Sequence, residues 1–471
     1  MFSIRVTDNR AAMFVTHPAA YAAFPRLLPV ALAVVLLSAS VANAQLGSYN
    51  PPPGPQGTFA IRGAKIVPVT GAELASGTLV ISGGKITAVG ANVTIPAGAQ
   101  VIDGAGLTVY PGMMDAGTTL GLSEIGQGAN ATVDVAEVGS FNPNAMAYMG
   151  LNPHSAHIGV TRVVGITHVM SRPTGGLLSG QATIVNLAGS TVPQMAMVKS
   201  AAMAMELPRS GFGGRRGGGG DFAALFAAAG NTQEVQRTRL RQLDSLRAMI
   251  KDADAYGKAF AAWDKDKSLP RPRSDVVLAS MVPAVRGQVP VLMVADRATD
   301  IRESVLFAEE MKLKPIIVGG RDAWQVASFL KQHDVPVLLG SIMDLPSRED
   351  DPYDVNFSAP GKLAAAGVRI AITSGNGGAE ARDLPYHAGM ASAFGLGKDD
   401  ALRAVTLWPA QIMGIADRVG SLEVGKVANV VVTDGDILEA KTTTRFLFID
   451  GRMVPLGTKH SALNDEFKDR K

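Results

Sequence analysis

The middle of the chain alternates short apolar runs with segments that have the periodicity of amphipathic helices. The apolar runs are rich in β-branched residues and show little alternation, which is typical of parallel strands buried on both faces. They span Thr161–Met170, Ala182–Leu187, Val289–Ala295, Pro315–Val318, Val335–Gly340 and Gly367–Thr373. Helices are predicted between them over Arg302–Met311, Ala323–His333 and Lys398–Val405. This repeat predicts a parallel α/β barrel over residues 113–416.

Short strands separated by glycine turns flank the barrel region on both sides. In residues 59–112, two apolar runs flank a Ser82-Gly83-Gly84 turn, and in residues 417–456 two runs flank Asp450-Gly451. Both patterns are typical of β-hairpins. Neither segment is large enough to bury an apolar face alone. We therefore expect the two segments to form one composite β-sandwich, because the barrel returns the chain to its start.

The first 44 residues have the pattern of a secretory signal peptide. A basic residue precedes the apolar run Leu27–Ala39, and Ala42-Asn43-Ala44 supplies a small-residue cleavage site. The run is too short for a stable membrane span, which disfavours the alternative of a retained anchor. Residues 45–58 follow as a Pro/Gly linker. We expect a mature protein that begins near Gln45 and is periplasmic or secreted.

Composition narrows the class of protein. Of the 471 residues, 47% are hydrophobic and 18% charged, which fits a globular protein and argues against general disorder. The formal net charge of +3 gives no reason to expect a nucleic-acid partner. The chain has no cysteine, so an exported form has no disulfide framework. Its stability must come from core burial.

Two further segments differ from the barrel repeat. Residues 206–220 are rich in glycine and are predicted to form a flexible surface loop. An amphipathic helix is predicted from about Asn231, with Leu243, Leu246 and Ile250 on one face. We interpret it as a helix that lies on the barrel, and a partner-binding helix is the alternative. Residues 457–471 are interpreted as a C-terminal tail.

Several motifs resemble the amidohydrolase superfamily, in particular its imidazolonepropionase-like branch. Pro111-Gly112-Met113-Met114-Asp115 resembles the end of the family's first barrel strand, and Gly175–Gln181 resembles its Gly-Gly-x-x-Ser-Gly-Gln segment. Ala401–Leu438 is similar to a run in which a helix ends in Pro-Ala and Gly-Ser-Leu-x-x-Gly-Lys follows. The resemblance covers roughly Phe59 to Pro455. It implies a TIM (β/α)8 barrel with a composite β-sandwich, and hydrolysis of carbon–nitrogen bonds as the family activity.

The resemblance also implies where metal ligands would lie, and this sequence lacks them. In the family, histidines after strands one, five and six and an aspartate after strand eight hold Zn²⁺ or another divalent ion, which activates water. The corresponding positions here are Gly117, Thr119, Val294 and Gly319 for the histidines, with Ser374 or Gly375 for the aspartate. We therefore expect no catalytic metal. Thr118, Asn376 and His387 are predicted as possible pocket residues at the barrel mouth.

Other candidate clusters give weaker signals. His154 and His157 are three residues apart, but a pair without a third ligand is more typical of ordinary loop histidines. His168 lies in a predicted strand and is expected to be a hydrogen-bonded core residue. Lys199 and Glu206 lie near the position where some relatives place a metal-bridging residue. Without the histidines no metal ions are bound for such a residue to bridge.

Three functions follow from these observations as alternatives. The first is a catalytically degenerate family member that acts as a binding or partner subunit, together with an active amidohydrolase homologue. The second is an active hydrolase of carbon–nitrogen bonds, including dipeptides, with an unconventional site. The third is a periplasmic protein that binds a small molecule in the barrel mouth. An oligomer is also expected. The missing ligands favour the first and third alternatives, because fold alone does not establish activity.

Overall fold

The computed structural model describes residues 52–126, 130–208, 232–346, 348–375 and 377–470. These residues belong to one compact unit, Ser48–Lys471. The predicted signal peptide, residues 45–51 of the predicted linker and residues 209–220 of the predicted glycine-rich loop lie outside the described residues. Within the described ranges, no helix is both long enough and apolar enough to span a membrane.

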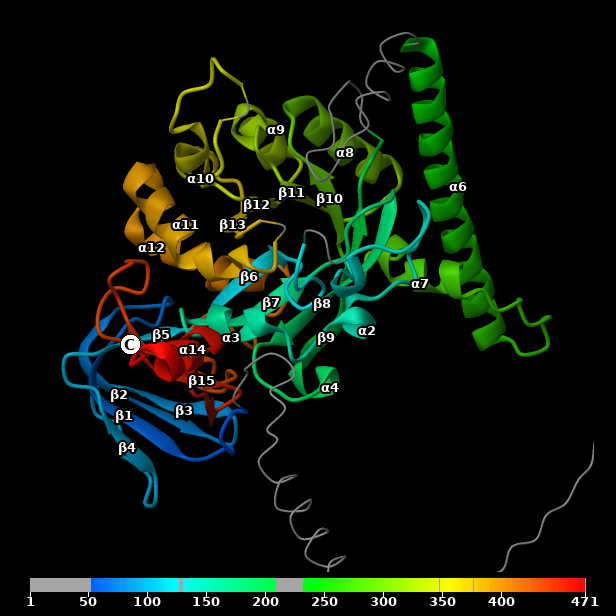
Figure 1. The fold of residues 1–471 in the computed structure, drawn as a ribbon. Helices are drawn as coiled ribbons and strands as arrows, with labels where there is room; N and C mark the ends of the chain where they lie inside the picture. Colours follow the sequence, from blue (N-terminus) through cyan, green and yellow to red (C-terminus); the bar gives the residue numbers. More distant parts are fainter. Residues whose placement is uncertain (1–51, 127–129, 209–231, 347, 376, 471) are drawn as a thin grey trace, which may run out of the picture. The chain divides into compact units, whose positions relative to one another are not determined.

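Eight strands form a nearly closed barrel sheet in the order β13-β12-β11-β10-β9-β8-β7-β6 (Figure 1). Neighbouring strands are parallel, except that β8 runs antiparallel to both β7 and β9. The predicted α/β barrel is confirmed, with one correction: the strand predicted over Ala182–Leu187 runs antiparallel to its neighbours instead of parallel. The predicted separate composite sheet is confirmed by the second sheet described below. The strand bounds are β6 (Met113–Thr118), β7 (Ile166–Ser171), β8 (Leu178–Asn186), β9 (Ala196–Met205), β10 (Val291–Ala295), β11 (Pro315–Gly319), β12 (Val337–Leu339) and β13 (Ile370–Ile372).

The barrel interior is a packed apolar core. Every strand contributes a side chain to it: Met114, Ala116, Met170, Ala182, Ile184, Ala202, Leu292, Ile316, Val318, Leu338 and Ala371. Ala410, Met413, Ile415 and Val419, from the segment that leaves the barrel, belong to the same cluster. Because the interior is filled, chemistry in such a barrel is confined to loops and strand ends.

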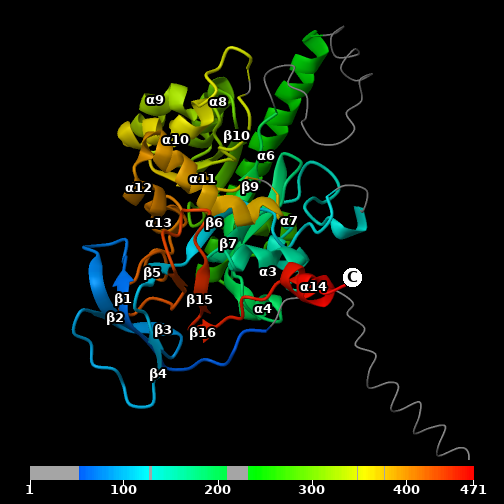
Figure 2. The same cartoon turned by 60° about the vertical axis from the view of Figure 1, so that its left-hand side comes forward.

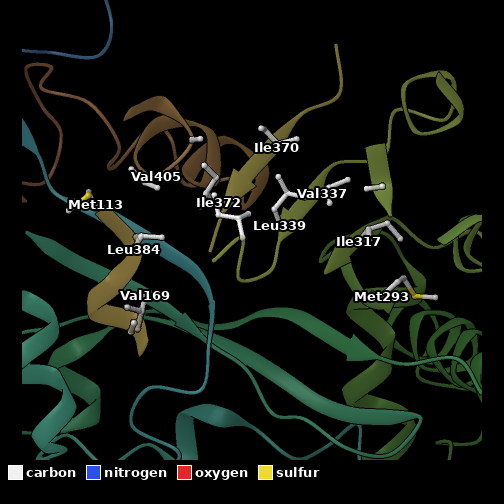
Figure 3. Packing of buried hydrophobic residues seen from close by; sticks show 14 of the residues in the cluster. Met113, Val169, Met293, Ile317, Val337, Leu339, Ile370, Ile372, Leu384 and Val405 are labelled. Atoms are coloured by element: carbon white, nitrogen blue, oxygen red, sulfur yellow. The ribbon is translucent and has the colours of Figure 1, made fainter. Parts of the chain in front are cut away.

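A second apolar layer separates the strands from the surrounding helices. Figure 3 shows part of it, with Met113, Val169 and Met293 on strands and Leu384 on helix α11. The helices and helical turns are η1 (Asn130–Thr132), α2 (Ala147–Gly150), α3 (Ala156–Arg162), α4 (Val192–Met195), α6 (Thr232–Lys265), α7 (Val276–Val285), α8 (Ala298–Glu310), η2 (Ala323–Val326), α9 (Ala327–Gln332), α10 (Val355–Ala365), η3 (Glu380–Asp383), α11 (Leu384–Ala391), η4 (Ser392–Leu396), α12 (Lys398–Arg403), α13 (Leu407–Ile412) and α14 (Lys459–Phe467).

The long helix α6 is amphipathic, as predicted. Its buried positions Leu243, Leu246, Ile250 and Ala253 follow one another at intervals of three or four residues, which places them on one helix face. That face packs against α7, and the two helices stand beside β9 and β10 in Figure 1. Helix α7 begins after Asp275, whose carboxylate accepts hydrogen bonds from the N–H groups of Val277 and Leu278.

Segments from both ends of the described chain form the second sheet. Its order is β16-β15-β14-β5-β1-β2-β3, with β4 paired to β1. Antiparallel pairing of β14 with β5 joins the two segments, with Val432 opposite Val109, and Figure 2 shows β15 and β16 beside the N-terminal strands. The bounds are β1 (Phe59–Ile66), β2 (Leu74–Ser82), β3 (Lys85–Gly90), β4 (Gln100–Asp103), β5 (Thr108–Pro111), β14 (Val430–Thr433), β15 (Thr444–Ile449) and β16 (Arg452–Met453).

The strand predicted over Thr161–Met170 begins later than the sequence pattern indicates. Helix α3 continues through Arg162, and β7 starts at Ile166. The helix is initiated by Ser155, whose hydroxyl accepts a hydrogen bond from His157 N–H. Gly165, with φ of +96°, then turns the chain into the strand.

Candidate functional site at the strand ends of the barrel

The positions at the end of the first barrel strand, β6, lie beside the end of the last barrel strand, β13. A Cβ built on Gly117 would lie 3.0 Å from Cγ2 of Thr373, which directly follows β13. The hydroxyl of Thr118 donates a hydrogen bond of 2.9 Å to the carbonyl oxygen of Gly377. Thr119 is buried in the same loop. These positions are therefore close to the eighth strand, but none of them offers an imidazole.

The fifth- and sixth-strand positions lie on the neighbouring strands β10 and β11. Val294 packs against the interior cluster and so faces into the barrel. Gly319 has φ of +97°, and a Cβ built on it would lie 2.5 Å from Oδ1 of Asp296. A side chain at position 319 would require a left-handed backbone and movement of this carboxylate.

The eighth-strand position Ser374 is hydrogen-bonded to Asp115 of β6. The Ser374 hydroxyl donates to Oδ2 of Asp115, and the backbone N–H of Gly117 donates to Oδ1 at 3.1 Å. Asp115 is fully buried, and this burial raises the pKa of its carboxyl to about 6, although the hydrogen bonds from Ser374 and Gly117 lower it. The next residue, Gly375, has φ of +101°. Of the two positions predicted for the family aspartate, Ser374 donates a hydrogen bond to another carboxylate, and Gly375 has no side chain.

A buried arginine lies among the acidic residues at this end of the barrel. Arg172 directly follows β7, and its backbone N–H donates to the carbonyl oxygen of Thr118 at 3.1 Å. Its side chain is 2% exposed. Burial lowers the pKa of the guanidinium to about 10, while the charges of Glu206, Asp296 and Asp115 raise it. The strand ends therefore hold a cation supplied by the protein itself.

A small cavity opens at the ends of β10, β11 and β12. Its volume is about 40 Å³, and a water molecule needs on the order of 10–15 Å³ on this scale. It has room for a few waters but not for a dipeptide. Its lining consists of Asp296, Gly319, Gly320, Arg321, Leu339, Gly340, Ser341, Ile342, Asn356 and Ala359.

The structure does not bring the candidate histidines together. The ring Nε2 of His157 lies 2.9 Å from the carbonyl oxygen of Glu124, and His154 is exposed. His168 is fully buried, and its Nδ1 lies 2.8 Å from the hydroxyl of Thr167. Burial lowers the pKa of His168 to about 3. The expectation of a hydrogen-bonded core histidine is thus met.

His387 lies on the buried face of α11, where it is 3% exposed. Burial lowers the pKa of its imidazole to about 4, and within the described part of the chain its Nδ1 has no hydrogen-bond partner. A role for His387 in lining a pocket remains a prediction. Asn376, the other predicted pocket residue beside Thr118, lies outside the described residues.

These residues do not fit the family's metal centre. Two of the four histidine positions are glycines without a donor atom, and Val294 is apolar. Among the described residues, no group of three or more His, Cys, Asp and Glu side chains is arranged to hold a metal ion. The remaining carboxylates share their region with the Arg172 guanidinium, which would repel a divalent cation.

Asp115 entered the sequence prediction only as part of the Pro-Gly motif, and Arg172 and Asp296 were not predicted as site residues. Arg172 and Asp296 each come directly after an apolar strand, and Asp115 lies inside one. Side chains at the carboxyl ends of parallel strands meet at one end of a barrel, so their positions in the sequence carried a signal. The sequence could not show that Arg172 lies near acids from three other strands, because this depends on the order of the strands in the sheet.

A barrel with its polar site at the strand ends, joined to a sheet built from both sides of the chain, is the architecture of the amidohydrolases. Residues 330–458 match the model of the amidohydrolase family. An amidohydrolase from Thermotoga maritima MSB8 has a similar structure, with a TM-score of 0.72 and 24% identity, covering 84% of this chain and 99% of that one. The match over residues 330–458 and the shared fold agree with the resemblance of the sequence motifs to the amidohydrolases.

Two further relatives extend the comparison. Amidohydrolase tasK of Hapsidospora irregularis is 24% identical over 371 residues, or 76% of this chain, and this chain spans only 37% of that relative's length. Molinate hydrolase has a TM-score of 0.52 at 18% identity, with 85% of this chain and 95% of that chain covered. At these identities the structural likeness establishes the fold.

Proposed function

We propose that this chain is a catalytically degenerate amidohydrolase-family protein that acts as a binding or partner subunit. The observation that carries the proposal is the sixth-strand position. Gly319 has a positive φ, and the carboxylate of Asp296 lies where a side chain at position 319 would begin. A metal-binding histidine at this position would need a different local backbone and movement of the Asp296 side chain.

The chemistry of the remaining residues supports the same conclusion. Hydrolysis by the family mechanism needs a metal-bound water whose pKa falls from 15.7 to about 7. Losing one ligand can leave a weakened site, but here all four imidazoles are replaced. The remaining side chains lack the donors that would offset dehydration of the ion.

Binding of a small molecule at the strand ends of the barrel is disfavoured by the small size of the cavity beside Asp296, which leaves a partner role as the better proposal for this site. The cavity volume of about 40 Å³ is far below the roughly 300–1,000 Å³ of typical ligand pockets. An active amidohydrolase homologue is the partner we propose, either in a mixed oligomer or in a separate complex. Export to the periplasm, motivated by the apolar run Leu27–Ala39, would place both proteins in the same compartment.

Elemental analysis and hydrolysis assays on the purified mature protein test this proposal. The substrate panel includes dipeptides ending in proline and cyclic amides, because a structural relative is a prolidase. We expect far less than one equivalent of Zn, Mn, Fe or Ni per chain and no turnover, with or without added Zn²⁺. A stoichiometric metal together with turnover abolished by a chelator would instead support the alternative of an active hydrolase with an unconventional site.

A further inference from the structure

The end of the barrel that would hold a metal collects acidic side chains from three strands. Asp115 lies in β6, Glu206 follows β9 and Asp296 follows β10. Asp115 is fully buried, Glu206 is half-buried and Asp296 is exposed at the rim. Negative charges on one low-dielectric rim repel one another and lose hydration, so they need a compensating cation.

Arg172 is positioned to supply that cation. In the sheet order β10-β9-β8-β7-β6, its strand β7 lies between the strands that carry Glu206 and Asp115. The hydrogen bond from Arg172 N–H to Thr118 O fixes its backbone beside the end of β6. Its side chain is almost entirely buried, and the charges that favour its protonated form are those of Glu206, Asp296 and Asp115.

We infer that the Arg172 guanidinium takes the place of the metal ion as the cation that neutralises the carboxylates at the strand ends. The inference rests on the proposed function, since it concerns a barrel without a catalytic metal. A guanidinium is always charged and offers five donors, but it has no open coordination site and cannot activate water. Replacement of the metal ion by a guanidinium would therefore keep the carboxylates at the strand ends neutralised but leave no group that activates water.

Thermal unfolding of the mature chain tests this role with Arg172→Met. Removal of one partner from a buried charge cluster is strongly destabilising, and we expect the melting temperature to fall by roughly 5 °C or more. Addition of 1 mM Mn²⁺ should then raise the melting temperature of this variant by roughly 2–4 °C, because without the guanidinium an ion can bind weakly near Asp296 and Glu206, the two of the three acids that are not fully buried. The wild-type protein should not respond, because its own guanidinium excludes the ion.

Arg162→Met is the matched control. Arg162 is also 2% exposed, and burial likewise lowers the pKa of its guanidinium to about 10, but it lies on α3, outside this acidic cluster. Its loss should be destabilising without any response to Mn²⁺. Should Arg172→Met fail to fold, the double variant Arg172→Met/Glu206→Gln removes one acid as well and is expected to fold.

The outcomes separate the two proposals. Equal responses of the Arg172→Met and Arg162→Met variants to Mn²⁺ would overturn the role of Arg172, as would failure of the double variant to fold. Both results leave the proposed function intact if the wild-type protein is free of metal. A wild-type protein that carries a stoichiometric metal overturns the proposed function itself.

Discussion

Gly112 provides the sharpest test of why the chain has the sequence Pro111-Gly112 before β6. A Cβ built on Gly112 would lie 2.1 Å from Oγ1, 2.3 Å from Cγ2 and 2.7 Å from Cβ of Thr167. Rotation of the threonine side chain cannot relieve the contact with its Cβ. Strands β6 and β7 must therefore move apart if position 112 carries a side chain. The motif, on this reasoning, is a packing requirement.

The expected cost of Gly112→Ala follows from these contacts. Overpacking a filled core by one methyl group costs about 1–3 kcal/mol. Thr167 also pairs with Nδ1 of His168 at 2.8 Å, and disturbing such a bond costs about 1 kcal/mol more. We therefore expect the free energy of unfolding to fall by about 2–4 kcal/mol.

Urea titration followed by tryptophan fluorescence measures this loss. Gly90→Ala in β3 is the matched control, because a Cβ there meets only Val93 Cγ2 at an ordinary 3.5 Å, and it should change stability by less than about 0.5 kcal/mol. The pair Gly112→Ala and Thr167→Ala should be coupled by about 1 kcal/mol or more, because the second change removes two of the three close contacts. If Gly112→Ala were as mild as Gly90→Ala, the packing explanation would be wrong.

Three further predictions concern the buried histidine, the composite sheet and the leader. The folded-state pKa of His168 is about 3, below the ordinary 6.5, so the unfolded chain binds a proton first as the pH falls and stability is lost below pH 6.5. Between pH 7 and pH 5 the wild-type protein should lose about 2 kcal/mol more stability than His168→Gln, as measured by urea titration at each pH, and the difference isolates His168 from the other buried titratable groups, His387 and Asp115. Deletion of residues 417–456 should destabilise the whole protein, since β5 loses its partner β14, and full cooperative stability of the truncated chain in calorimetry would count against the composite sheet. N-terminal sequencing of the exported form should find Gln45 or a close neighbour, whereas an intact Met1 or Met13 on a cytoplasmic protein would refute export.

Much of the barrel could be predicted because its strands are short, β-branched and separated by helical periodicity. Pro315–Gly319 and Ile370–Ile372 are clear cases, since Ile and Val make up three of the five residues in the first and two of the three in the second. Strand β9, Ala196–Met205, was not predicted, because it contains four alanines, which are depleted in strands, and a single β-branched residue. It becomes a strand because small side chains fit the crowded barrel interior, which is a tertiary effect.

The candidate site was predictable only where a motif fixed the alignment. Gly117 and Gly319 could be assigned to ligand positions by their distance from Pro111 and from the predicted strand. The positive φ of Gly319 and the approach of Asp296 depend on how the following loop turns, which no local pattern encodes. The position of Arg172 among acids from other strands depends likewise on a strand order that includes an antiparallel β8.

The pairing of β5 with β14 also determines how late in synthesis the second sheet can be completed. Val109 and Val432 are 323 residues apart, so at 5–20 residues per second the ribosome needs roughly 16–65 s between them. During that interval one edge of β5 has no strand to pair with, and such edges promote aggregation in newly made chains. The edge of β5 therefore stays unpaired until residues 430–433 have been made.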